Sequence, residues 1–143
     1  MMFRNLVAWF RRKREARAAA VMFERKVIVD FNEEGISAAY PDGVTQAIAW
    51  SAVECLAIVT NDSGPWDTDV WWLIEGKETR CAYPQGATGD SAALEEYQRR
   101  FPGFSDIAVI EAMGSTSNAR FVCWERSAQL QTYQAGEKPR PLA

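Results

Sequence analysis

Two stretches, "CLAIVTN" at residues 55–61 and "DVWWLIEG" at residues 69–76, decide the fold of this chain. In each of them apolar residues stand at successive positions, so a strand formed there carries apolar side chains on both of its faces. Strands of this kind lie in the centre of a sheet or between two layers. We therefore expect a pair of central strands, with the rest of the domain arranged around it.

Shorter strands are predicted on either side of this pair, each bounded by turn residues. Three precede the pair, one follows it directly, and a last one returns near the C-terminus. They are expected at 26–31 ("KVIVDF"), 36–40 ("ISAAY"), 44–50 ("VTQAIAW"), 77–84 ("KETRCAYP") and 119–126 ("ARFVCWER").

Two helices are predicted between the last two strands, where the apolar period lengthens from two residues to that of a helix. Asp90 is the expected N-cap of the first helix and Ser105 that of the second, which ends before Gly114. The residues expected to face the core are Leu94, Tyr97 and Phe101 in the first helix, and Ile107, Ile110 and Met113 in the second.

This order of elements predicts an α+β fold. We expect a curved antiparallel sheet or partial barrel of about six to seven strands, with two short C-terminal helices and an N-terminal amphipathic helix. The 143 residues suffice for one core. We assign residues 1–24 to a basic amphipathic helix, 25–126 to a single α+β domain and 127–143 to a weakly structured tail.

The first part of the chain is basic and the rest is acidic. Residues 1–29 hold eight Lys/Arg and two Glu, whereas residues 30–143 hold eight Lys/Arg and seventeen Asp/Glu. Apolar residues recur at helical spacing in the basic part, and cations follow them towards its C-terminal half. The apolar residues of this pattern are Phe3, Leu6, Val7 and Phe10.

Several interpretations of the basic helix stay open. It packs on the domain with a solvated basic face, binds a partner helix, or lies on an anionic membrane; alternatively, Met22 is the true first residue. No apolar run approaches the roughly 18–20 residues that span a bilayer, and no continuous apolar signal segment is present. We expect a cytoplasmic protein, peripheral to the inner membrane if this helix binds lipid. The membrane-binding residues would then be Phe3, Trp9, Phe10, Arg11, Arg12, Lys13 and Arg14.

Several motifs resemble a family of small, uncharacterised proteobacterial α+β proteins. The matching pieces are "VIVDFNEEGI", "DGVTQAIAWSAVE", "TNDSGPWDTDVWWLIEG", "YPQGATG" and "FPGFSDIAVIEAMGSTSNARFVCWER", which span about residues 27–126. The strand-rich part is also similar to pleckstrin-homology-like folds, although two helices and a strand end the domain where that fold has a single helix. The resemblance implies a fold and no activity.

Catalysis has little support in the sequence. There is no His, so the commonest general base and metal ligand are missing, and the three cysteines follow no metal-binding spacing. We expect these cysteines to be reduced and buried. The hydroxyls of residues 115–117 have no evident base; Glu111 and Glu125 flank them as potential paired carboxylates. The aspartates between residues 62 and 69 do not follow calcium-loop spacing. We expect no enzyme activity, no metal and no cofactor, and the acidic domain disfavours nucleic acid.

A connection between the two central strands is the remaining candidate site. Residues 61–68 are more than a tight hairpin needs, and the chain has five acidic residues and no Lys or Arg from Glu54 to Gly76. An exposed Trp beside carboxylates suits a basic protein partner, because the acids speed encounter and the Trp anchors the complex. The expected partner-binding residues are Asp62, Trp66, Asp67 and Asp69. The alternative is that Trp66 folds back over the sheet and the aspartates only solubilise the loop.

These observations favour a non-enzymatic protein-binding module. Its sharpest version is an immunity-like protein that neutralises a basic toxin, and its alternative is a peripheral membrane module. The sequence does not predict the oligomeric state.

Replacing Asp62, Trp66 and Asp67 together by Ala is expected to weaken partner binding at least about tenfold, because a buried Trp anchor alone is worth that much. The melting temperature should stay nearly unchanged, since loop residues contribute little to the core. Titration calorimetry and thermal unfolding of the triple variant measure both quantities. Unchanged affinity would remove this loop from the binding site.

Overall fold

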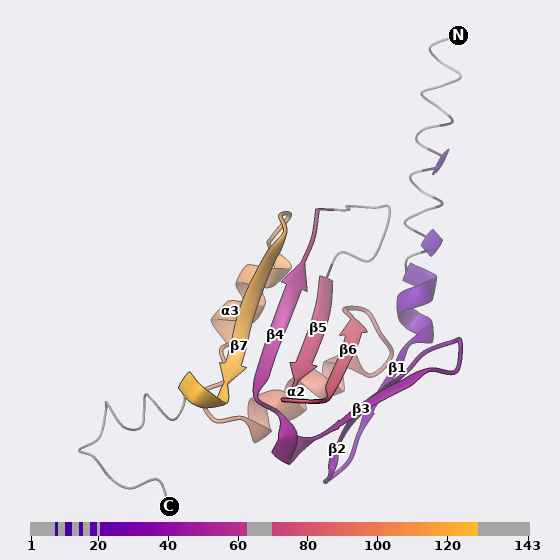
Figure 1. Cartoon of the computed structure of the whole chain (residues 1–143). Helices are drawn as coiled ribbons and strands as arrows, with labels where there is room; N and C mark the ends of the chain where they lie inside the picture. The colour runs from indigo at the N-terminus through magenta and orange to yellow at the C-terminus, as the bar shows by residue number, and fades with distance from the viewer. Residues whose placement is uncertain are drawn as a thin grey trace, which may run out of the picture.

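The computed structural model describes residues 21–62 and 70–128, together with residues 8, 11, 12, 15, 18 and 19. Within this part, seven strands and the helices α2 and α3 follow one another along the chain (Figure 1), and residues 21–26 and 126–128 are helical as well. They are β1 (Ile28–Phe31), β2 (Gly35–Ala39), β3 (Thr45–Ala49), β4 (Cys55–Thr60), β5 (Val70–Glu75), β6 (Arg80–Pro84), α2 (Asp90–Arg100), α3 (Asp106–Met113) and β7 (Ala119–Glu125). A single 3₁₀ turn, Trp50–Ala52, separates β3 from β4.

The α+β class with antiparallel strands is confirmed, but the strands do not form one continuous sheet. The strands form two antiparallel sheets, one of three strands in the order β1-β2-β3 and one of four in the order β6-β5-β4-β7, and the described strands close no barrel. β4 and β5 are the central strands of the larger sheet, as their apolar sequences predict. They pair over their whole length, from Cys55 opposite Glu75 to Thr60 opposite Val70.

Side chains hold the two sheets apart where β3 passes β6. The N–H of Ala82 in β6 donates to the Oε1 atom of Gln46 at 2.8 Å, and the Tyr40 hydroxyl donates to the carbonyl of Ala82. These two side chains occupy the positions that a neighbouring backbone would take in a continuous ladder. Because Ala82 is already satisfied, β3 and β6 lie side by side without pairing.

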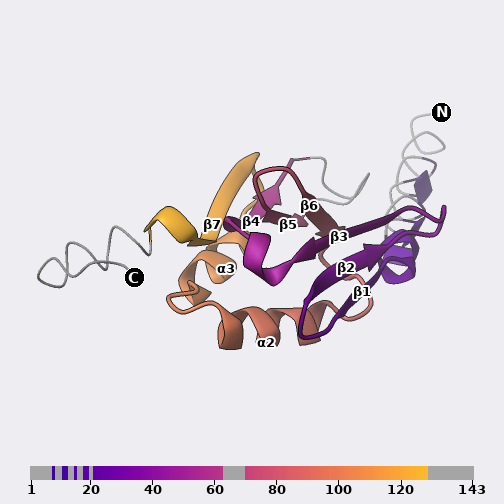
Figure 2. The ribbon, with the colours of Figure 1, turned by 60° about the horizontal axis from the view of Figure 1, so that its bottom comes forward.

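The helices α2 and α3 cover the same face of the four-stranded sheet, as the two views in Figure 1 and Figure 2 show. On this inner face Trp72 of β5 is 2% exposed and stacks on Tyr83 of β6 with ring centroids 6.4 Å apart. Tyr97 of α2 lies against the same Trp ring, and its hydroxyl is 2.6 Å from that of Tyr83. The buried hydroxyls therefore satisfy each other within an aromatic core.

The connection before α2 protects the outer edge of β1. The Val29 N–H donates to the carbonyl of Thr88 at 2.8 Å, and the Thr88 N–H donates to the carbonyl of Val27 at 2.9 Å. Gly89 follows with φ of 95°, and a Cβ atom there would stand 2.2 Å from the carbonyl oxygen of Val29. Only glycine fits this close approach with that backbone conformation.

The N-cap of α2 differs from the expectation, whereas the N-cap of α3 agrees with it. Gly89 rather than Asp90 is the N-cap of α2, and the Asp90 carboxylate accepts a hydrogen bond from Gly86 instead. In α3 the N-cap Ser105 is confirmed, since its hydroxyl accepts from the Ala108 N–H. Gly114 ends α3 in a right-handed conformation, with φ of −91°.

The three apolar residues of α3 that were expected inward point to solvent. Their exposed fractions are 69% for Ile107, 71% for Ile110 and 42% for Met113. A repeat of three residues turns away from any fixed helix face by about 60° at each step. The small side chain of Ala112, which is fully buried, instead sets the contact of α3 with the core.

Replacing Gln46 by Ala is expected to destabilise the fold by about 1–3 kcal/mol, because the Ala82 N–H would lose its acceptor in a partly buried place. The matched control is Gln98→Ala, which removes an exposed hydrogen bond to Asp106 and should change the free energy of unfolding by less than about 0.5 kcal/mol. Urea unfolding of both variants measures the difference. Equal free energies would show that Gln46 does not bridge the sheets.

Glu96 gives the fold a dependence on pH. Its buried carboxylate accepts hydrogen bonds from Arg99 at 2.6 and 2.9 Å and from Arg100 at 3.3 Å. The bonds from Arg99 are the main cause that lowers its pKa from the usual value of 4.5. A lowered carboxyl pKa stabilises the fold above the unfolded-state pKa, and this stabilisation is lost as the pH falls through the folded-state pKa.

The variant Glu96→Gln is therefore expected to be less stable than the parent chain at neutral pH by about 0.5–1 kcal/mol. The difference should shrink as the pH falls from about 5 to about 3, because the parent chain loses its ion pairs there. Glu95→Gln, at the exposed neighbouring position, should show no such convergence. Urea unfolding at a series of pH values tests this. A difference that stays constant with pH would contradict the role given to Glu96.

Candidate functional site

Of the predicted partner loop, residues 61–68, the structure describes only the first two residues, and Asp62 is the one predicted binding residue among them. Asp62 is exposed, and its backbone N–H donates to the Asn118 side chain at 3.2 Å, which ties the end of β4 to the turn before β7. Trp66, Asp67 and Asp69 lie outside the described residues, so their role as binding residues stays a prediction.

The membrane-binding residues are described in part. Arg11 and Arg12 are helical and exposed, and residues 21–26 are helical as well. The other residues of that prediction, Phe3, Trp9, Phe10, Lys13 and Arg14, lie outside the described part. Among the helices that are described, none is long and apolar enough to cross a membrane.

The potential catalytic groups do not converge. Glu111 lies near the end of α3, whereas Glu125 lies at the far end of β7, beyond the intervening turn and the length of that strand. Ser115 and Ser117 serve the structure, because the buried Thr60 hydroxyl donates to the carbonyl of Ser117 at 2.8 Å and contacts the Ser115 hydroxyl at 3.1 Å. Within residues 21–62 and 70–128, no group of three His, Cys, Asp or Glu side chains is placed to hold a metal ion.

The three cysteines are free, and two of them are buried as expected. Burial raises the pKa of the Cys81 and Cys123 thiols to about 12. Cys55 is partly exposed; its pKa is also raised by partial burial, which the nearby Arg120 guanidinium opposes. Its Sγ atom lies 3.5 Å from Nη2 of Arg120.

An apolar surface lies on the side of the four-stranded sheet that faces away from α2 and α3. Trp71 and Trp72 face opposite sides of the sheet. The register places Trp71 beside Val59 of β4. The neighbouring row of side chains on the same side is formed by Leu73, Ala57 and Val122. Val59, Trp71 and Leu73 are partly exposed, Val122 is 42% exposed, and Ala57 is enclosed by its neighbours. We call these five residues the open face. In Figure 1 the open face is turned towards the viewer, with α2 and α3 behind the sheet.

Charged residues lie on this side of the sheet as well, because Arg120 pairs with Val59 and Glu75 with Cys55 in the register. Arg120 of β7 reaches across the sheet and donates to the Glu75 carboxylate at 2.6 Å. Arg126, directly after β7, donates to Glu54 at 2.7 Å. An apolar centre with a rim of charged and polar groups is the usual anatomy of a protein–protein interface.

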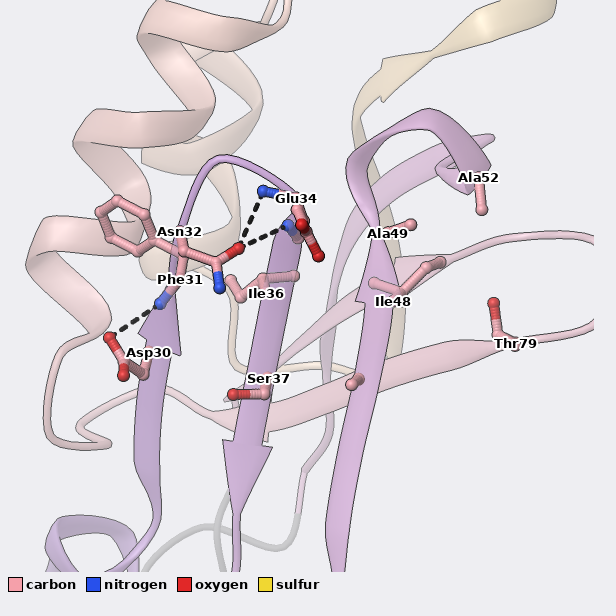
Figure 3. A pocket seen from close by; sticks show the side chains of 12 residues that line it. Asp30, Phe31, Asn32, Glu34, Ile36, Ser37, Ile48, Ala49, Ala52 and Thr79 are labelled. Atoms are coloured by element: carbon pink, nitrogen blue, oxygen red, sulfur yellow. Dashed lines mark hydrogen bonds between the residues drawn. The ribbon is translucent and has the colours of Figure 1, made fainter.

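The second surface is a trough over the outer side of the three-stranded sheet (Figure 3). It encloses about 500 Å³ between the β1–β2 turn and the β5–β6 turn. The Asn32 side chain shapes its upper end by accepting hydrogen bonds from the N–H groups of Glu34 and Gly35. Its lining residues are Asp30, Phe31, Asn32, Glu34, Gly35, Ile36, Ser37, Ala47, Ile48, Ala49, Ala52 and Thr79.

Neither surface was assigned as a site from the sequence. The signal for the open face was present, because β4 and β5 are apolar on both faces; what the sequence could not show is that only one face is covered. The trough joins three segments far apart in the chain, and no motif marks it. It also lies at the opposite end of β4 from Asp62, since Ala52 precedes that strand and Asp62 follows it.

No protein-family model, curated protein or solved structure matches the chain. The resemblance to a proteobacterial family and to pleckstrin-homology-like folds stays a prediction.

Proposed function

We propose that the chain is a protein-binding module without catalytic chemistry of its own, and that it binds its partner through the open face. The observation that carries this proposal is that the central strands β4 and β5 carry apolar side chains on both sides of the sheet, whereas α2 and α3 cover only one side. Antiparallel sheets with a solvated face normally place polar residues on it. An apolar centre rimmed by polar residues is characteristic of an interaction site.

The composition of the open face supports this use. Trp71 supplies a large aromatic surface with an indole N–H donor. Trp is one of the residue types that most often dominate the binding energy of an interface. Leu73 of β5 and Val122 of β7 lie on either side of Ala57 in β4, so the apolar area extends over three strands. A partner that covers these side chains gains hydrophobic stabilisation in proportion to the apolar area removed from water.

The charge of the domain favours a basic partner. Residues 21–62 and 70–128 carry fifteen Asp/Glu and eight Lys/Arg. An excess of negative charge speeds the encounter with a positively charged protein and discourages acidic ones. An immunity-like role, in which the module covers a basic toxin, is the specific form of this proposal. The partner-binding residues predicted from the sequence, Asp62, Trp66, Asp67 and Asp69, remain candidates in this role.

The variant Val122→Asp tests this function, because it places a charge in the open face at a site already 42% exposed. Affinity capture from the native cell, followed by calorimetry with the captured protein after purification, measures binding. We expect at least a tenfold loss of affinity, since a buried unpaired carboxylate is strongly unfavourable in an interface.

The matched control is Val44→Asp, because Val44 is 52% exposed and lies between β2 and β3, away from the open face. This variant should bind like the parent chain. Circular dichroism melting curves check that both variants stay folded. A partner that binds Val122→Asp and Val44→Asp equally well would show that the open face is not the binding surface.

A further inference from the structure

We propose that the trough binds the basic segment 11–17 of a second copy of this chain. This contact is separate from the open face and does not depend on the function assigned to that face. It would link copies head to tail, since the surface that gives the segment and the surface that receives it are different.

The trough is suited to a cationic chain. Asp30 and Glu34 are exposed on its rim, and its twelve lining residues include no Lys or Arg. Between these carboxylates and Thr79 the side chains are small, so an incoming chain can approach the sheet closely (Figure 3).

The free edge of β3 adds backbone groups to the trough. Hydrogen bonds from Tyr40 to Val44 and from Trp50 to Glu34 fix which pairs of β2 and β3 exchange bonds. By the alternation of an antiparallel ladder, Ala47 turns its N–H and its carbonyl away from β2. No hydrogen bond joins these two groups to another described residue. The Ala47 carbonyl can therefore accept a hydrogen bond from a cationic side chain of a segment bound in the trough.

The basic segment has the complementary charge. Residues 11–17 read "RRKREAR", with five cations and one Glu. Arg11 and Arg12 are exposed in the structure. Arg side chains bind carboxylates with two parallel hydrogen bonds. Asp30 and Glu34 should therefore bind an Arg-rich segment more tightly than a neutral segment.

The segment belongs to another copy because of where each part lies. The helical residues 21–26 adjoin the beginning of β1, whereas Asp30 and Glu34 lie at and beyond its other end. In Figure 1 these helical turns stand at the upper end of β1 and the β1–β2 turn lies at the lower end. The segment of the same chain would have to fold back along β1 to reach these carboxylates, while that of a second copy meets no such constraint.

Sedimentation equilibrium of the full chain provides the first test. Exposed ion pairs are weak and screened by salt. We therefore expect self-association with a dissociation constant on the order of 100 µM at about 0.01 M salt, and no self-association at about 1 M salt. A chain that starts at Met22 keeps every residue of the buried core and should be monomeric in both conditions. A full chain that stays monomeric at low salt would overturn the proposal.

A labelled peptide of residues 9–20, titrated into the chain that starts at Met22, locates the contact. We expect Asp30→Asn combined with Glu34→Gln to weaken peptide binding at least tenfold. The control combines Glu95→Gln with Glu111→Gln, which changes the net charge equally at exposed positions outside the trough and should leave binding within twofold. Equal loss in both double variants, or a peptide that binds only vesicles of anionic lipid, would contradict the trough as its site.

Discussion

The pairing of β4 with β5 is the interaction on which the rest of the structure depends. Its inner side chains, Trp72 among them, build the core together with α2 and with the three-stranded sheet. Four of its outer side chains, Ala57, Val59, Trp71 and Leu73, are also apolar, but neither α2 nor α3 packs over them. The hydrophobic effect that folds the domain is thus satisfied on one side of this pair only, and the other side retains a driving force for association.

Two surfaces of different chemistry result from the way the sheets are separated. The open face is apolar and lies on the large sheet, whereas the trough is acidic and lies on the small one. Gln46 and Tyr40 maintain the separation by satisfying Ala82 with side chains. If β3 and β6 paired through their backbones instead, the β3 edge that lines the trough would be consumed. The same polar contacts therefore stabilise the fold and leave an edge available for binding.

The local pattern of the sequence predicted the strands, the two helices and the central place of β4 and β5, because apolar period and turn residues act over short range. The division into two sheets was not predicted, since it depends on Gln46 meeting Ala82 across 36 positions of the chain. The exposure of Ile110 was missed because the depth at which α3 packs is set by the contact of Ala112 with the core, not by α3 alone. The candidate surfaces were not predicted for a similar reason. Whether a sheet face stays exposed depends on where the helices pack, and the local sequence of the strands does not determine that.

Cysteine alkylation tests the central claim, that the open side of the four-stranded sheet is accessible in the isolated chain and covered by a partner. Cys55 lies on this side and is partly exposed, whereas Cys81 and Cys123 are buried. Peptide mapping after brief treatment of the folded chain with iodoacetamide should find Cys55 modified at least tenfold faster than the two buried thiols, and protected once the partner is bound. Alkylation of Cys55 as slow as that of Cys81 in the isolated chain, or unchanged by the partner, would contradict the account.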